Sequence, residues 1–396
     1  MISFGDAYVE VLKHAQDYGI ETCKLSDAHG RVLAEDVLAD RDLPPYDRAT
    51  RDGIAIAFDA YENGRRSFEI EAVVAAGVPT HSLSKPSFCV EIMTGGVVPY
   101  ETDTVIMYEH LEIEKGIAEI KHLPKQGQNI HRKGSDATKG EVLIKKNIRI
   151  TAAEIGILAA VGYDQVPVKS NPKITVISTG NELVEINEVP KRHQIRRSNA
   201  PTIVSALEMI QIHPLSYHIR DDKDLLRQKL SYVIQEMDVV ILSGGISKGK
   251  FDFLPQVLAE LGTDVLIHRV RQRPGKPFLF GKHSTHNTLI FGYPGNPVST
   301  FVSHHIYFNA WYKRSMGYTN QDVNVQLNSE VNGLAGMTQL IPVSTEIKKS
   351  KLVATPVPQN GSGDFISLVN ADGIVILDEH NGTYAKGQMA PYVKTR

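Results

Sequence analysis

The sequence contains little cysteine. Its two cysteines, Cys23 and Cys89, are far apart and belong to no CxxC or Cys/His spacing. This argues against a disulfide scaffold and against a structural zinc site. Two reduced thiols suit a reducing compartment, so we expect a cytoplasmic protein.

The chain also lacks a charge excess and a long apolar run. Its formal net charge is −2, an ordinary globular balance that argues against a nucleic-acid partner. No run of about 20 apolar residues occurs, and no basic start followed by an apolar stretch opens the chain. The sequence therefore predicts a soluble, unexported protein with no membrane partner.

Signatures of zinc-dependent or acyl-transfer catalysis are missing as well. The fifteen histidines show no HExxH or related metal spacing, and His304 and His305 suit packing or surface positions better than ligand positions. No Ser/His/Asp set can be assembled from the sequence, so acyl transfer has no support.

What the sequence does contain is a modular α/β pattern. A chain of 396 residues exceeds one compact core and suggests roughly two to four units. The predicted fold class is an α/β multidomain protein with a parallel-sheet domain, a β-rich insertion, a discontinuous helical/β domain and a small C-terminal domain resembling a β-barrel. The predicted boundaries are 1–42 plus 140–168 for the discontinuous domain, 43–139 for the insertion, 169–318 for the parallel-sheet domain and 319–396 for the C-terminal domain.

Two capped helices flank the insertion. Residues 3–16 predict an amphipathic helix capped by Ser3, with Asp6 three residues on. Thr151 and Glu154 form a second capping box before AAEIGILAAVGY. Between them, short alternating segments broken by Gly and Pro predict strands. We infer that both flanks belong to one discontinuous domain.

Strands and helices alternate between residues 173 and 317, which predicts a parallel sheet with ligands at the carboxyl ends of its strands. Three turn-rich loops lie close together here: SGGISKGKFD (243–252), RQRPGKP (271–277) and GYPGNPVS (292–299). Glycines let backbone N–H groups approach phosphate, Lys248 and Lys276 supply charge, and Asp252 can hold a divalent cation. Together they predict an anion pocket.

Each loop also has an ordinary interpretation. STGNEL, which carries Thr179, Gly180 and Glu182, reads alone as a tight turn. RPGKP holds Arg273 and Lys276 towards one oxyanion, or else is a surface turn with solvated charges. Asp52 in RDG and Thr94 in MTGG stand beside Asp-Gly and Gly-Gly pairs, which are common in turns, so each motif alone is weak evidence for a site. The functional interpretation depends on the loops occurring together.

Read in order, the motifs resemble those of the molybdopterin molybdenumtransferase family, which includes the C-terminal domain of gephyrin. The resemblance covers essentially the whole chain and is most specific in STGNEL, SGGISKGKFD, RPGKP, GYPGNPVS and PQNGSGDF (358–365). It implies an enzyme that binds adenylylated molybdopterin in the parallel-sheet domain, takes molybdate, releases AMP and forms molybdenum cofactor with Mg²⁺ assistance.

The resemblance also implies site residues, position by position. Glu182 and Asp252 would hold Mg²⁺, while Arg273, Lys276 and Ser362 would receive molybdate. The implied catalytic residues are Asp52, Asp136, Glu182, Asp221, Asp252 and Lys276; the implied binding residues are Thr94, Thr179, Gly180, Ser243, Gly244, Gly245, Ser247, Arg273, Pro294, Gly295, Asn296, Ser299 and Ser362.

The chain departs from the family pattern at several positions. RATRDG replaces the usual SAMDG around Asp52, and Arg273 replaces a usual lysine, which keeps the charge but changes its geometry. His131 stands where an arginine is common. Ile341 stands where some members have an arginine, which weakens the predicted molybdate site.

The resemblance further implies a homodimer in which the insertion of one subunit completes the pocket of the other, and a molybdopterin adenylyltransferase as partner. Two alternatives stay open. One is a catalytically weakened paralogue or molybdopterin-binding scaffold protein, favoured by Ile341 and RATRDG. The other is molybdopterin adenylylation, although single-domain proteins carry out that reaction.

Overall fold

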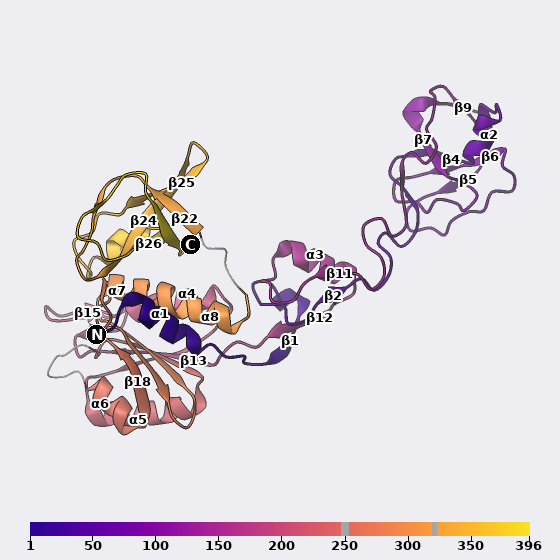
Figure 1. The fold of residues 1–396 in the computed structure, drawn as a ribbon. Helices are drawn as coiled ribbons and strands as arrows, with labels where there is room; N and C mark the ends of the chain where they lie inside the picture. Colours follow the sequence, from indigo (N-terminus) through magenta and orange to yellow (C-terminus); the bar gives the residue numbers. More distant parts are fainter. Residues whose placement is uncertain (247–252, 319–322) are drawn as a thin grey trace.

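The computed structural model describes residues 1–246, 253–318 and 323–396. The molecule is elongated (Figure 1). An α/β sheet and a C-terminal β-sheet lie together at one end, a small unit lies in the middle, and the insertion occupies the other end. No helix within the described ranges is long and apolar enough to cross a membrane.

The largest unit is a six-stranded sheet in the order β16-β13-β17-β21-β20-β18. β16, β13, β17 and β21 are parallel, as predicted, and β13 and β17 are fully buried runs. Their carboxyl ends therefore share one edge. The elements are β13 Ile174–Thr179, α4 Asn199–Glu208, β16 Leu215–Ile219, α5 Lys223–Glu236, β17 Val239–Ser243, α6 Leu254–Glu260, β18 Thr263–His268, β20 Leu279–His283 and β21 Leu289–Tyr293, with the short pair β14 Leu183–Val184 and β15 Ile195–Arg196.

The sheet is mixed at one margin, which the simple alternation of helices and strands did not predict. β20 is antiparallel to both β21 and β18. Only a short turn separates β20 from β21, and a connection that short joins antiparallel strands, since a parallel pair needs a long crossover. β18 consequently runs in the direction of β21, so the loop after it reaches the same edge as the other strand ends.

Helix α1 (Phe4–Lys13) packs against the α/β core. Ser3 caps it as predicted, accepting from the Asp6 N–H at 3.1 Å. Its buried residues Ala7 and Val11 join the cluster around Trp311. The sequence did not predict this contact between the start of the chain and the α/β unit. The closing helical segment consists of α7 Pro297–Ser303, the π-helical turn His304–Phe308 and α8 Asn309–Ser315.

The C-terminal strands close into a small barrel. The order is β19-β24-β25-β22-β28-β26, and a further pairing of β24 with β26 completes the ring. β19 comes from the α/β part of the chain, so the two units share a strand pairing. The elements are β19 Gln272–Arg273, β22 Val323–Leu327, β24 Thr338–Lys348, β25 Lys351–Pro356, β26 Gly373–Leu377 and β28 Met389–Lys394, with β23 Val331–Asn332, β27 Thr383–Tyr384 and a 3₁₀ turn Phe365–Asn370.

The middle unit combines residues from both sides of the insertion. Antiparallel pairs join β1 to β12 and β2 to β11. The predicted capping box is confirmed, because Thr151 and Glu154 bond each other's backbone at the start of α3. The elements are β1 Ile20–Lys24, a 3₁₀ turn Leu25–Asp27, β2 Val37–Leu38, β11 Val142–Ile144, α3 Ala152–Ala160 and β12 Gln165–Lys169.

The insertion is β-rich, as predicted. Six of its strands form one sheet in the order β7-β4-β6-β5-β9-β8, and β3 pairs with β10. Phe68 and Ile54 are fully buried against the six-stranded sheet. The elements are β3 Arg48–Ala49, β4 Gly53–Ile56, α2 Phe58–Glu62, β5 Ser67–Val74, β6 Phe88–Ile92, β7 Thr104–Met107, a 3₁₀ turn Tyr108–His110, β8 Leu111–Glu114, β9 Ile117–Ile120 and β10 Ile130–His131.

Candidate functional site

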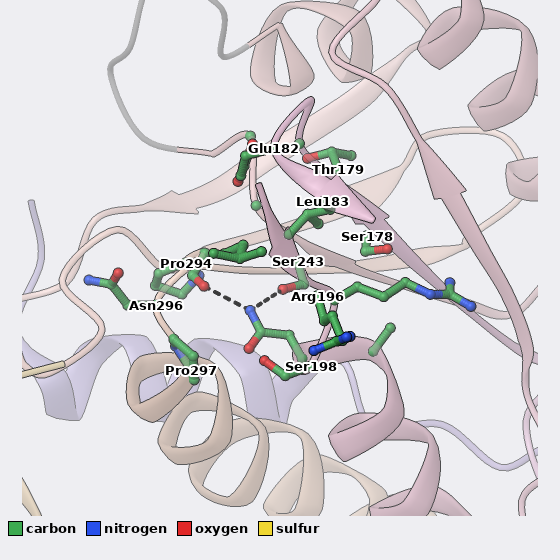
Figure 2. Close-up of a pocket in the computed structure, with 18 of the residues that line it drawn as sticks. Ser178, Thr179, Glu182, Leu183, Arg196, Ser198, Ser243, Pro294, Asn296 and Pro297 are labelled. Atoms are coloured by element: carbon green, nitrogen blue, oxygen red, sulfur yellow. Dashed lines mark hydrogen bonds between the residues drawn. The ribbon is translucent and has the colours of Figure 1, made fainter. Parts of the chain in front are cut away.

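A cavity of about 1220 Å³ opens where β13, β17 and β21 end (Figure 2). We call it the strand-end cavity. It gathers the predicted loops because parallel strands present their carboxyl ends at one edge. The predicted residues that line it are Thr179, Gly180, Glu182, Asp221, Ser243, Gly244, Gly245, Pro294, Gly295 and Asn296.

The loop after β13 places a carboxylate beside the cavity. Gly180 has φ +146, and a Cβ there would lie 2.8 Å from the Glu182 carboxylate oxygens. Asn181 ties this loop to the one after β16: its N–H donates to Asp221 Oδ2 at 3.3 Å, and the Asp221 N–H donates to Asn181 Oδ1 at 3.2 Å. Glu182 and Asp221 are thus held on neighbouring loops.

Two glycines after β17 bring the backbone against Thr179. Gly244 has φ +94, and a Cβ would lie 2.5 Å from the Thr179 carbonyl oxygen. At Gly245, φ is +65 and the Thr179 hydroxyl would lie 2.8 Å from a Cβ. That hydroxyl is buried and has no hydrogen-bond partner in the described part of the chain. Only glycine permits this turn geometry and this close approach.

Asn199 joins the loops that follow β17 and β21. Its Nδ2 donates to Ser243 Oγ at 2.9 Å and to the Gly295 carbonyl at 2.8 Å, the two dashed lines of Figure 2. Asn199 is the first residue of α4, and Ala200 and Pro201 also line the cavity. The N-terminus of a helix favours negative charge, so the wall formed by α4 favours an anion.

Sequence reasoning missed this wall. Arg196, Arg197 and Asn199 line the cavity but were not among the predicted residues. Arg196 Nε donates to the Glu188 carbonyl at 2.9 Å, and Arg197 forms a 2.9 Å ion pair with Glu185. The available signal was RRSNAP, an arginine pair directly before a helix start.

A second cavity of about 620 Å³ lies between the α/β loops and the C-terminal barrel. We call it the junction cavity. It shares Pro277, Pro294 and Asn296 with the strand-end cavity, so the two adjoin. The predicted residues that line it are Arg273, Lys276, Pro294, Asn296, Ser299 and Ser362.

The junction cavity is positively charged. Neither Arg273 nor Lys276 has an ion-pair partner among the residues that the structure describes. Asn296 Nδ2 donates to Ser362 Oγ at 2.7 Å, which fixes the barrel loop against the start of α7. Ile341 contributes apolar surface to the lining. The cavity therefore combines two cations that have no ion-pair partner in the described ranges with hydroxyls and an apolar wall, a set suited to a compact oxyanion.

The predicted residues of the insertion lie elsewhere. Asp52 and Thr94 line neither cavity, and β4, which follows Asp52, lies at the opposite end of the molecule from the α/β sheet (Figure 1). The Thr94 N–H donates to Asp52 Oδ1 at 2.6 Å. This bond, with a further one from the Thr94 side chain, holds the pKa of Asp52 below its ordinary value.

Asp136 is also outside both cavities. Its carboxylate lies 2.8 Å from His131 Nε2, and His131 Nδ1 lies 3.1 Å from an Arg48 guanidinium nitrogen. The histidine at this position therefore bridges an arginine and a carboxylate. The structure brings predicted residues together at the two adjoining cavities, and within one chain Asp52, Thr94 and Asp136 line neither of them.

Of the two predicted Mg²⁺ ligands, the structure describes Glu182 alone. Glu182 lines the strand-end cavity, whereas Asp252 and Ser247 lie outside the described residues. Within the described ranges, no group of three or more His, Cys, Asp or Glu side chains could hold a metal ion.

Comparison with known proteins gives a consistent result over the whole chain. Three protein-family models match: "MoeA N-terminal region (domain I and II)" at residues 2–162, "Probable molybdopterin binding domain" at 175–310 and "MoeA C-terminal region (domain IV)" at 324–394.

Similar proteins and structures match end to end. The chain is 37% identical to the molybdopterin molybdenumtransferase of Synechocystis sp., covering 99% of both chains. It is 31% identical to that of Bacillus subtilis, covering 97% of this chain and 92% of that one. A crystal structure of the molybdopterin biosynthesis MoeA protein of Pyrococcus horikoshii superposes with a TM-score of 0.83 at 28% identity, covering 100% of this chain and 99% of that one.

Proposed function

Because the chain belongs to the MoeA family of molybdopterin molybdenumtransferases, we propose that it inserts molybdenum from molybdate into adenylylated molybdopterin and releases AMP. The observation that carries this proposal is the pair of adjoining cavities, which share Pro277, Pro294 and Asn296. The reaction needs two different anions side by side. Adjoining cavities of unequal size, both lined by cations, meet that need.

The strand-end cavity is the proposed site for adenylylated molybdopterin. Its volume of about 1220 Å³ suits a large ligand. The glycine turns after β13 and β17 allow backbone N–H groups to approach phosphate, and Arg196 and the start of α4 add positive charge opposite them.

Molybdate is the proposed ligand of the junction cavity. Arg273 can grip an oxyanion through two N–H groups, while Lys276 acts as a compact point charge. Ser299 and Ser362 offer hydroxyls from two further loops. Ile341 leaves one wall without a donor, so the grip on molybdate depends chiefly on the RPGKP loop.

Mg²⁺ assistance is part of the proposal. Glu182 and Asp221 give the strand-end cavity hard oxygen ligands, and Mg²⁺ is usually held by one or two carboxylates together with substrate phosphates. Asp252 is the further proposed ligand. Bound there, the ion would neutralise phosphate charge as the AMP bond breaks.

We also propose a cytosolic homodimer. Asp52, Thr94 and Asp136 lie away from both cavities within one chain, so a second subunit is the source that could supply them. A molybdopterin adenylyltransferase is the proposed supplier of the adenylylated substrate. Cys23 and Cys89 are both free thiols, in keeping with a reducing compartment.

The test is incubation with adenylylated molybdopterin, Mg²⁺ and molybdate while AMP and molybdenum cofactor are measured together. The proposal predicts that both form and that both require molybdate. Lys276→Ala should abolish the molybdate-dependent part, whereas Lys85→Ala, which changes a lysine of the insertion, should not. Binding of the adenylylated substrate without turnover would favour the scaffold alternative. ATP consumption with metal-free molybdopterin would favour adenylylation.

A further inference from the structure

The loop that carries Arg273 and Lys276 rests on buried polar side chains that no sequence motif singles out. Gln272 begins the loop and is 0% exposed, and Tyr307, on the π-helical turn beneath, is also 0% exposed. Neither side chain faces solvent, and burying such polar groups is costly unless they are bonded. Their partners therefore show what they hold in place.

Both ends of the Gln272 amide are used. The Tyr307 hydroxyl donates to Gln272 Oε1, and Gln272 Nε2 donates to the Gly275 carbonyl at 3.1 Å. The Tyr307 ring stacks on Phe278, with centroids 4.1 Å apart and planes 10° apart. The helical segment is thus linked to the tip of the loop through two hydrogen bonds, and a flipped amide would set its oxygen against the Gly275 carbonyl oxygen, where neither atom can donate.

The loop lies directly on this support. Gly275 has φ +83, and a Cβ there would lie 2.8 Å from Gln272 Nε2 and 2.9 Å from Ser303 Oγ. The Val270 N–H closes the loop by donating to the Lys276 carbonyl at 2.9 Å. On the other side, Arg273 pairs with Gln339 of β24 in the barrel. The loop is therefore held between the α/β core and the barrel.

We propose that Gln272 and Tyr307 are positioning residues for the oxyanion: they set the direction in which Arg273 and Lys276 enter the junction cavity. The inference rests on the proposed function of that cavity. Two cations on a short loop bind one anion tightly only if the loop already has one conformation. A mobile loop would have to be ordered when the anion binds, and the entropy lost in that ordering would weaken binding. Glu182, Asp221 and Asn199 lie on other loops, and Pro277 is the one residue of the RPGKP loop that lines the described strand-end cavity, so the adenylylated substrate depends much less on this support.

Tyr307→Phe is the direct test, because it keeps the ring that stacks on Phe278 and removes only the hydroxyl. Loss of that donor leaves the buried Gln272 Oε1 unpaired. We expect the KM for molybdate to rise about tenfold, the effect of one buried hydrogen bond. The KM for adenylylated molybdopterin should stay within about twofold, because the RPGKP loop contributes only Pro277 to the described lining of the strand-end cavity.

Tyr312→Phe is the matched control. Tyr312 is 4% exposed and lies five residues further along the same helical segment, but its hydroxyl donates to Asn171 Oδ1 at 2.8 Å, away from the loop. It should lose comparable thermal stability without a change in either KM. An equal rise in the molybdate KM for both variants would mean that general loosening, and not positioning, is responsible.

A second variant tests the link itself. Gln272→Met removes both amide bonds at similar volume, so adding Tyr307→Phe to it should raise the molybdate KM no further. Additive effects would overturn the proposal. Calorimetric titration with molybdate alone separates the two hypotheses: no binding by the wild-type protein contradicts the proposed function, whereas equal binding by wild-type and Tyr307→Phe proteins contradicts only the positioning role.

Discussion

The two groups of predicted site residues differ in how their polar atoms are satisfied. At the junction cavity, Arg273 and Lys276 have no ion-pair partner among the described residues. In the insertion, Asp52 is bonded to Thr94, and Asp136 is bonded to His131. Among the described residues, the first region presents two cations without an ion-pair partner to a cavity, whereas Asp52 and Asp136 of the second region are already hydrogen-bonded.

This difference indicates different roles. Unpaired cations in a fixed loop form a preorganised anion site, which needs no rearrangement before binding. A carboxylate already bonded, such as Asp52, keeps its charge because its pKa is lowered, but it must share or exchange partners to contact a ligand. We therefore expect the cavities to determine binding and the insertion to complete the site.

Apart from the variants that remove a charged site residue, the largest predicted effect comes from Gly275→Ala. A Cβ at this position would meet Gln272 Nε2 at 2.8 Å and Ser303 Oγ at 2.9 Å, so the loop must shift away from its support. Because a displacement of about 1 Å can cost on the order of 100-fold in rate, we expect molybdate-dependent AMP release to fall by about that factor. Steady-state assays measure it.

Gly77→Ala in the insertion is the matched control for that variant. Gly77 has nearly the same backbone angle, φ +78, but nothing lies within 4 Å of a Cβ there. Both variants carry the backbone strain of about 1 kcal/mol, and only one adds a clash. If Gly77→Ala lost as much activity, backbone strain alone would explain the result and the contrast between the regions would fail.

A smaller effect tests whether the insertion acts across a dimer. Glu182→Gln and Asp52→Asn should each be nearly inactive alone. If one subunit's insertion completes the other's cavity, random mixing makes about half of the dimers mixed, and one of the two sites in each mixed dimer is intact. Activity should recover to about a quarter of the wild-type value. No recovery on co-refolding would mean that each chain uses its own insertion or does not need it.

Much of this architecture follows from local sequence rules. The Ser3 and Thr151 caps are confirmed because capping depends on residues three apart. The loops after β13, β17 and β21 converge because parallel strands fix where they end. The sites of Asp52 and Asp136 stay predictions, since no contact within one chain tests them.

Other features depend on contacts that no local pattern encodes. Gln272 and Tyr307 are separated by 35 residues in the chain, and each looks unremarkable alone. Asn199 reads as a helix-start residue, yet its side chain bonds Ser243 and Gly295. β20 runs antiparallel to β21 and β18 because the turn between β20 and β21 is short. The alternation of helices and strands along the sequence does not reveal this.

The smallest predicted effect separates the two regions by their response to acid. Burial lowers the pKa of His305 to about 4, whereas an unfolded histidine titrates near 6.5. Between these values the unfolded state binds the extra proton, so the α/β unit loses stability as pH falls, by about 1.4 kcal/mol per pH unit for this residue. The Asp52 carboxylate of the insertion, whose pKa is lowered, loses its bonds only at lower pH.

Trp311 allows the acid-dependent loss of stability of the α/β unit to be measured, because it is the single tryptophan of the chain and is fully buried in the α/β core. Its fluorescence should report a melting temperature that drops a few degrees from pH 6.5 to pH 5.5. His305→Gln removes the titrating ring and should reduce this slope by about half, leaving the part due to His304, whose pKa burial also lowers. An unchanged slope would show that His305 already takes its proton in the folded protein, and that the acid response does not distinguish the α/β unit from the insertion.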